Sequence, residues 1–156
     1  MDFVYDDGGR ASAGFRGQTG DCVVRSIAIA TGKPYREVYD AVNVLAKTVN
    51  TVGARKSKSR DGVHRSVYDK YLLSIGWRWV PTMKIGSGCT THLDAAELPA
   101  GRLIVRVSKH MTCVIDGVIH DTFNPSDCGA TGRPDASGNL VWTVDRRCVY
   151  GYWVPA

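Results

Sequence analysis

Among the five cysteines of the chain, Cys22 has the surroundings of a nucleophile. It directly follows Gly20 and Asp21 and opens an apolar stretch with the composition of a buried helix. Free N–H groups and the dipole at a helix N-terminus lower the pKa of a thiol, and they can also bind the oxyanion formed when a carbonyl is attacked. A free cysteine is also commonly a small buried apolar residue. The position at the helix start favours the nucleophile.

A base for this thiol should be a histidine distant in sequence, because Cys–His pairs meet through the fold. The dipeptide Asp116-Gly117 stands between two β-rich runs and predicts a two-residue type I′ hairpin turn. Such a turn fixes which residues face each other across the two strands. It therefore allows a choice among the four candidates, which are His64, His92, His110 and His120.

The hairpin register selects one histidine and one carboxylate. Counting back from the turn, Thr112 faces Asp121, and His110 lies two residues before Thr112. His110 and Asp121 then share a sheet face as diagonal neighbours, roughly 7 Å apart at the backbone. His120 falls on the opposite face, beside Cys113. The alternative is that His110 and Asp121 are ordinary polar residues on paired strands.

Each of these residues can be given a role in proton transfer. Asp121 would hold the orientation and tautomer of His110, and His110 would take the proton from Cys22. Chemistry of this kind requires no metal ion and no organic cofactor. Arg25, one turn into the same helix, could steer an acidic substrate, but we expect it to pair with a carboxylate.

The elements that must position these groups follow from hydrophobic periodicity. Asp21 can cap a helix over residues 22–30 that ends at Gly32, a second helix begins at Pro34, and a third is expected over residues 63–75. Because helices come first and antiparallel strands follow, the class is α+β. Strands are predicted at Trp77 and Trp79 and over residues 103–107, 112–115, 118–122, 140–144 and 148–154.

Length and composition favour one domain over residues 1–156, with 44% hydrophobic and 22% charged residues. Residues 1–19 are expected to form an irregular lead-in, and residues 50–62, with Arg55 and Arg60, a mobile basic loop. No apolar run could span a bilayer, and the acidic N-terminus lacks the features of a signal peptide. We therefore expect a cytoplasmic protein with no membrane partner. The odd number of separated cysteines predicts reduced thiols.

The order of Gln18 and Cys22 on a first helix, then His110 and Asp121 on later strands, resembles papain-like cysteine peptidases. It is most similar to compact bacterial and phage forms, including the double-glycine leader peptidases. The resemblance implies a cysteine-bearing helix packed on an antiparallel sheet, with Gln18 as oxyanion-hole donor. It also implies a peptide, isopeptide or peptidoglycan-like amide as substrate, and a bacterium or a phage-infected cell as the source. The papain signature around the cysteine is absent.

The leading expectation is a thiol hydrolase that cleaves an amide or isopeptide bond through an acyl-enzyme. Its rival is a papain-like protein without turnover, for example a phage or mobile-element factor that blocks a host partner. The basic loop and the small size suit this binding or inhibitor protein. Separation of Cys22 from His110 in the structure would favour it.

A second rival is a zinc-stabilised nucleic-acid-binding module. Cys89 and His92 have ligand-like spacing, but no second close pair accompanies them. The net charge of +5 is modest, no RNA-binding signature is present, and the four tryptophans are better placed in the core or a cleft wall. A nucleic acid partner is therefore not expected. The other candidate zinc ligands are Cys113, Cys128 and Cys148.

Overall fold

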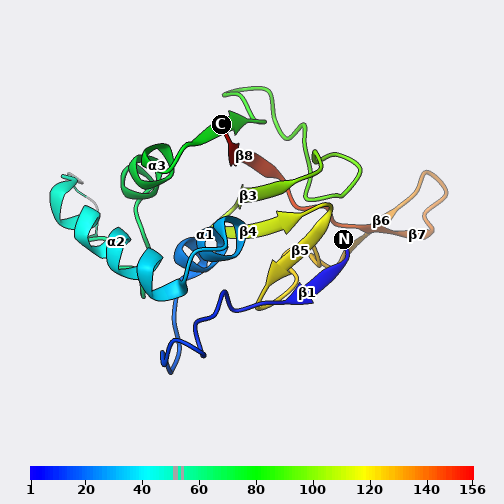
Figure 1. Cartoon of the computed structure of the whole chain (residues 1–156). Coiled ribbons are helices and arrows are strands. Elements are labelled where there is room, and N and C mark those ends of the chain that lie inside the picture. The colour runs from blue at the N-terminus through cyan, green and yellow to red at the C-terminus, as the bar shows by residue number, and fades with distance from the viewer. Residues whose placement is uncertain (51–52, 54) are drawn as a thin grey trace.

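Three helices and a six-stranded, mostly antiparallel sheet make up the computed structural model, which describes residues 1–50, 53 and 55–156 (Figure 1). The strand order in the sheet is β1-β5-β4-β3-β8-β2, and β6 and β7 form a separate two-stranded ribbon. This is the α+β class that the sequence predicted. The helices are α1 (Cys22–Thr31), α2 (Tyr35–Thr48) and α3 (Arg65–Ser74). The strands are β1 (Phe3–Tyr5), β2 (Trp77–Pro81), β3 (Arg102–Val107), β4 (His110–Ile115), β5 (Val118–Asp121), β6 (Ala130–Pro134), β7 (Leu140–Val144) and β8 (Val149–Pro155).

The helix boundaries follow local sequence signals. α1 begins at Cys22 and ends before Gly32, whose φ of 70° is the left-handed conformation that glycine adopts without strain. α2 begins directly after Pro34, as expected. α3 begins two residues later than predicted, because the His64 side chain accepts a hydrogen bond from the N–H of Ser66 and caps the helix there.

The β4–β5 hairpin has the predicted turn and register. Asp116 and Gly117 have φ values of 48° and 81°, and a type I′ turn needs positive φ at both positions. Val114 faces Ile119 across the two strands, and Ile115 and Cys113 face their predicted partners in the same register. The turn chemistry alone was sufficient to align these strands.

Two strands were not predicted. Phe3–Tyr5 was expected to be irregular, yet it pairs in parallel with β5, with Phe3 beside Ile119. β6 pairs with β7, and this ribbon projects away from the sheet (Figure 1). Trp142 on the ribbon is 65% exposed, so its expected place in the core or cleft wall is wrong. Periodicity gave no signal for either strand, since the residues of both are largely exposed and only pairing with a neighbour makes them strands.

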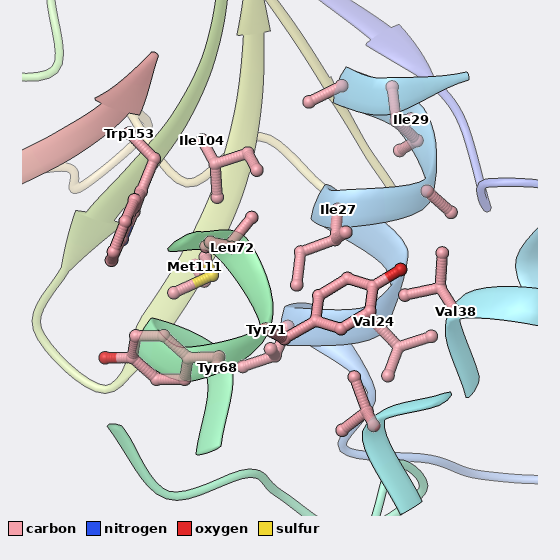
Figure 2. Packing of buried hydrophobic residues seen from close by; sticks show 14 of the residues in the cluster. Val24, Ile27, Ile29, Val38, Tyr68, Tyr71, Leu72, Ile104, Met111 and Trp153 are labelled. Carbon is pink, nitrogen blue, oxygen red and sulfur yellow. The ribbon is translucent and has the colours of Figure 1, made fainter. Parts of the chain in front are cut away.

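Both faces of the sheet are buried, each in a cluster of its own. One cluster joins the three helices to one face, where Figure 2 shows Ile104, Met111 and Trp153 turned toward helical side chains such as Ile27 and Leu72. The other cluster covers the opposite face with two leucines of the segment between β2 and β3. Its buried members are Leu93, Leu98, Leu103, Val105, Val107, Val114, Ile119 and Val149.

The basic segment expected to be mobile is an ordered turn where the structure describes it. Residues 51–52 and 54 of the predicted loop lie outside the described residues. Within the rest, Lys58 pairs with Gly62, and Ser59 is fully buried. The Ser59 hydroxyl donates to the carbonyl of Tyr39 over 2.7 Å, and its N–H donates to Asn43 Oδ1 over 2.9 Å. These bonds attach the turn to α2.

The expectation that all cysteines are reduced is wrong for one pair. Cys89 and Cys148 form a disulfide although 59 residues separate them. The pairing could not be read from spacing, because the sheet brings the start of β8 beside the segment that follows β2. Cys22, Cys113 and Cys128 are free thiols. Among the described residues, no helix has both the length and the apolar character needed to cross a membrane.

Candidate active site

The thiol of Cys22 and the imidazole of His110 meet where α1 approaches β4. Cys22 is the first residue of α1, His110 is the first residue of β4, and both line one cavity. The imidazole of His110 and the N–H of Met111, the next residue of β4, both lower the pKa of the thiol. A helix tip and a strand start that are distant in sequence thus form the pair that the sequence predicted.

Asp121 holds the other side of the imidazole ring. His110 Nε2 lies 2.8 Å from Asp121 Oδ2, so Nδ1 is the nitrogen left to face the thiol. Both side chains are largely buried, with 9% and 2% of their surfaces exposed. The ring of Phe123 packs against the imidazole with 4.8 Å between centroids. The imidazole is therefore fixed from two sides.

A second tight turn sets the position of His110. β3 ends at Val107, which pairs directly with His110, so Ser108 and Lys109 alone connect the two strands. Lys109 has a φ of 55°, a conformation that few residues other than glycine adopt. Arg147 donates a hydrogen bond to the carbonyl of Ser108 over 2.6 Å and holds the turn. Strained backbone of this kind clusters at functional sites.

The electrostatics favour a thiolate–imidazolium pair. Burial raises the pKa of Cys22, but the hydrogen bond and positive charge of His110 outweigh it and bring the pKa below the ordinary 9.0. The N–H of Met111 and the charge of Arg25 act in the same direction. Burial lowers the pKa of His110, but its bonds to Asp121 and Cys22 prevail and raise it to about 9. Both shifts favour a thiolate on Cys22 beside a protonated imidazole on His110.

Arg25 connects the carboxylate of this site to the helix that carries the thiol. Its guanidinium lies 3.0 Å from Asp121 Oδ1 and also bonds to Asp21 Oδ1. The hydroxyl of Tyr35 donates to Asp21 Oδ2 over 2.7 Å. Arg25 and both carboxylates are buried, so the charges are compensated inside the protein. The expectation that Arg25 pairs with a carboxylate is confirmed.

The side chain of Asp21 bonds to Arg25 and Tyr35 and therefore does not cap α1. Asp21 stands at the N-cap position as predicted, but its carboxylate makes no capping hydrogen bond. The N–H groups in the first turn of α1 are therefore not taken by that side chain. The N–H of Cys22 is the natural donor to an oxyanion formed at the thiol.

Gln18 is not brought to the site. Its side chain is exposed, and Gln18 does not line the cavity around Cys22. Only its carbonyl has a structural role, accepting a hydrogen bond from Arg60 over 3.2 Å. Arg60 belongs to the ordered basic turn, and its own carbonyl accepts from the N–H of Gly20 over 2.7 Å. The basic turn thus positions the backbone that leads into Cys22.

A cavity of about 800 Å³ opens on the thiol and imidazole. Its walls come from the lead-in, the basic turn, α1 and the β3–β4 turn, so the chain segments that hold the two groups also form the cleft. The lining includes aromatic residues and charges of both signs. Besides Cys22 and His110, these are Tyr5, Asp7, Arg10, Asp61, Tyr68, Arg106, Lys109 and Phe123.

The three other histidines are engaged elsewhere. His64 caps α3, His92 lies 3.2 Å from Glu97, and His120 lies 3.5 Å from Asp6. The residues of the zinc alternative do not gather, since Cys89 is bonded to Cys148 and Cys113 is in the core. Within the described part of the chain, no three His, Cys, Asp or Glu side chains form a metal-binding group.

Comparisons of the chain with protein-family models, with curated proteins and with solved structures found no match. The function of the site is therefore argued from its geometry. Sequence reasoning identified the thiol, the imidazole and Asp121, and it missed the bridging role of Arg25. The separation of Asp21 and Arg25 by four residues is the spacing of a helical ion pair and was the available signal.

Proposed function

We propose that this protein is a cysteine-nucleophile hydrolase that cleaves an amide or isopeptide bond through an acyl-enzyme. The observation that carries the proposal is that Cys22 and His110 line one cavity, where His110 lowers the pKa of Cys22 and Asp121 bonds to the far side of the imidazole. A thiol buried for packing alone has its pKa raised, as burial does to the pKa of Cys113. The pKa of Cys22 is instead lowered, and Cys22 lines a cavity.

The groups account for each step of such a reaction. The Cys22 thiolate attacks the carbonyl carbon, and the electron pair of the C=O bond moves to oxygen, where the Cys22 N–H can bind it. When the C–N bond breaks, the imidazolium of His110 gives its proton to the leaving nitrogen. A water molecule then attacks the thioester while neutral His110 accepts its proton. When this second intermediate collapses, the C–S bond breaks and its electron pair returns to Cys22 as thiolate. The carboxylic acid leaves, and His110 keeps the proton taken from water as imidazolium.

Asp121 contributes by orientation and charge. Its hydrogen bond fixes the imidazole with Nδ1 toward Cys22, and its negative charge stabilises the imidazolium. Peptides, isopeptides and peptidoglycan-like amides are the substrates that this machinery suits. The alternative of a catalytically silent binding protein is not favoured, because the thiol and the imidazole line one cavity and the imidazole lowers the pKa of the thiol.

Competitive alkylation tests the proposal. Cys128 is the exposed free thiol and Cys22 is only half-exposed, so accessibility alone predicts faster labelling of Cys128. We expect iodoacetamide at neutral pH to label Cys22 first, and we expect the variant His110→Ala to lose this preference. Peptide mapping by mass spectrometry measures both rates in one sample. Faster labelling of Cys128 in the wild-type protein would refute the activated thiol.

A further inference from the structure

A second cavity, of about 330 Å³, lies beside the catalytic cleft. We call it the basic groove and define it by six of its lining residues. They come from the start of α3, from β2 and the segment after it, from β3 and from β8. These residues are Arg65, Trp79, Met83, Lys84, Arg106 and Tyr150.

Arg106 joins the basic groove to the catalytic cleft, because its side chain lines both cavities. It pairs across the sheet with Met111, the residue whose N–H lowers the pKa of the Cys22 thiol. The two cavities therefore lie on either side of Arg106.

The groove is positively charged. Its lining contains three cationic side chains and no carboxylate. Arg65 is paired with Asp69 over 3.1 Å. Within the described residues, neither Lys84 nor Arg106 forms an ion pair with a carboxylate. Two cations thus remain for a ligand with negative charge.

Irregular backbone shapes the floor of the groove. Arg106 pairs with Gly151 and Val107 pairs with Val149, so Tyr150 is an extra residue in β8. Bulges of this kind redirect a side chain and are enriched beside active sites. The Tyr150 ring lies 5.9 Å from the Arg106 guanidinium. Gly151 leaves room for the Trp79 ring, since a Cβ atom there would come within 2.3 Å of it.

The outer wall is apolar and firmly attached. Met83 is 41% exposed, and the neighbouring Ile85 is fully exposed, so both offer apolar surface to a ligand. The Thr82 hydroxyl donates to the carbonyl of Val149 over 2.7 Å. The Cys89–Cys148 disulfide closes the far end of the same segment onto β8. The wall segment is therefore attached near both of its ends.

We propose that the basic groove binds a carboxylate-bearing side chain, with an apolar neighbour, of the peptide that occupies the catalytic cleft. The inference rests on the proposed hydrolase function, because it treats the groove as an extension of that cleft. Arg106 and Lys84 supply the charge, and Met83 supplies the apolar contact. A nucleic acid fits less well, since the Trp79 ring already contacts Gly151 and carries the Arg65 guanidinium at 5.3 Å.

Peptide selection on Cys22→Ala protein tests the groove without requiring turnover. Random dodecapeptides would be selected on this protein, and the enriched sequences would be synthesised with a fluorophore for anisotropy measurements. We expect Asp or Glu beside an apolar residue in the enriched peptides. Adding Arg106→Glu should weaken their binding about tenfold or more, because it places a like charge opposite the carboxylate. Lys84→Glu, at an exposed position, should act in the same direction without risk to folding.

Lys47→Glu on α2 is the matched control, because it makes the same charge change at an exposed site away from the groove. It should leave the dissociation constants unchanged. Failure to enrich any peptide, enrichment without carboxylates, or binding insensitive to both groove variants would overturn the inference. Tighter binding of a single-stranded oligothymidylate than of any peptide would also overturn it. Unreactive Cys22 with intact acidic-peptide binding would instead refute only the hydrolase.

Discussion

Arg25 Nη2 lies 3.0 Å from Asp121 Oδ1, so a cation on the helix that begins at Cys22 holds the carboxylate that bonds to His110. The same guanidinium bonds to Asp21, the residue directly before Cys22. The bonds form a circuit from Asp21 through Arg25 and Asp121 to His110, which lines the same cavity as the thiol. Helix and hairpin are thereby locked in one relative position.

Replacing Arg25 by methionine should destabilise the protein strongly. Asp21 and Asp121, with side chains 0% and 2% exposed, would each lose a buried partner. Removing one member of a buried ion pair typically costs about 3–5 kcal/mol. Urea denaturation followed by tryptophan fluorescence measures the loss in free energy of unfolding. Lys33→Met, which breaks an exposed pair with Glu37, is the control and should have little effect; equal effects for both variants would contradict the circuit.

The pH dependence of the thiol should report on its partner. We expect the alkylation rate of Cys22 to rise with an inflection below the ordinary thiol pKa of 9.0. In His110→Ala the inflection should move upward, because burial then acts with less opposition. Alkylation rates measured by mass spectrometry from acid to alkaline pH give the inflection in both proteins. The same inflection in both would show that the imidazole does not influence the pKa of Cys22.

Asp121→Asn should lower the pKa of His110 from its value of about 9. The carboxylate charge stabilises the imidazolium, and an amide at the same position keeps a hydrogen-bonding oxygen without the charge. Because the proposed hydrolase reaction needs protonated His110 to expel the leaving nitrogen, the alkaline limb of any such activity should shift to lower pH. NMR titration of the His110 ring protons measures the pKa directly; the signals of His64, His92 and His120 serve as internal controls. An unaltered His110 titration would contradict the assigned role of Asp121.

Reducing the Cys89–Cys148 disulfide should lower stability. A cross-link that closes a loop of this length, with 59 residues of separation, contributes about 4 kcal/mol at most in the chain-entropy treatment. Cys148→Ser should reproduce the effect of reductant, whereas Cys128→Ser should not change stability. Urea denaturation with and without reductant compares the three proteins. Identical curves for Cys148→Ser and wild type would show that the link does not form.

The β6–β7 ribbon should be dispensable. None of its residues belongs to either buried cluster, and four of its large apolar side chains are exposed. The N–H of Asp145 donates to the carbonyl of Gly129 over 2.9 Å, so the ends of the ribbon are adjacent and a Gly-Gly linker can replace residues 130–144. We expect the free energy of unfolding to change by less than about 1 kcal/mol and Cys22 labelling to be unchanged. A large decrease in the free energy of unfolding or in the rate of Cys22 labelling would show that the rest of the fold depends on the ribbon.

Local sequence chemistry determined much of the site. Gly32 ended the helix that begins at Cys22, and Asp116-Gly117 fixed the register that brings Asp121 toward His110. These features depend on residues close in the chain, where capping, turn geometry and alternation act directly.

Only the tertiary structure decided which surfaces meet. It placed the tip of α1 against β4, turned Asp21 from a helix cap into a partner of Arg25, and left Gln18 outside the cleft. It also joined Cys89 to Cys148 and drew Phe3–Tyr5 into the sheet. Such contacts join segments far apart in sequence, and periodicity states which face of an element is apolar without stating what will cover it.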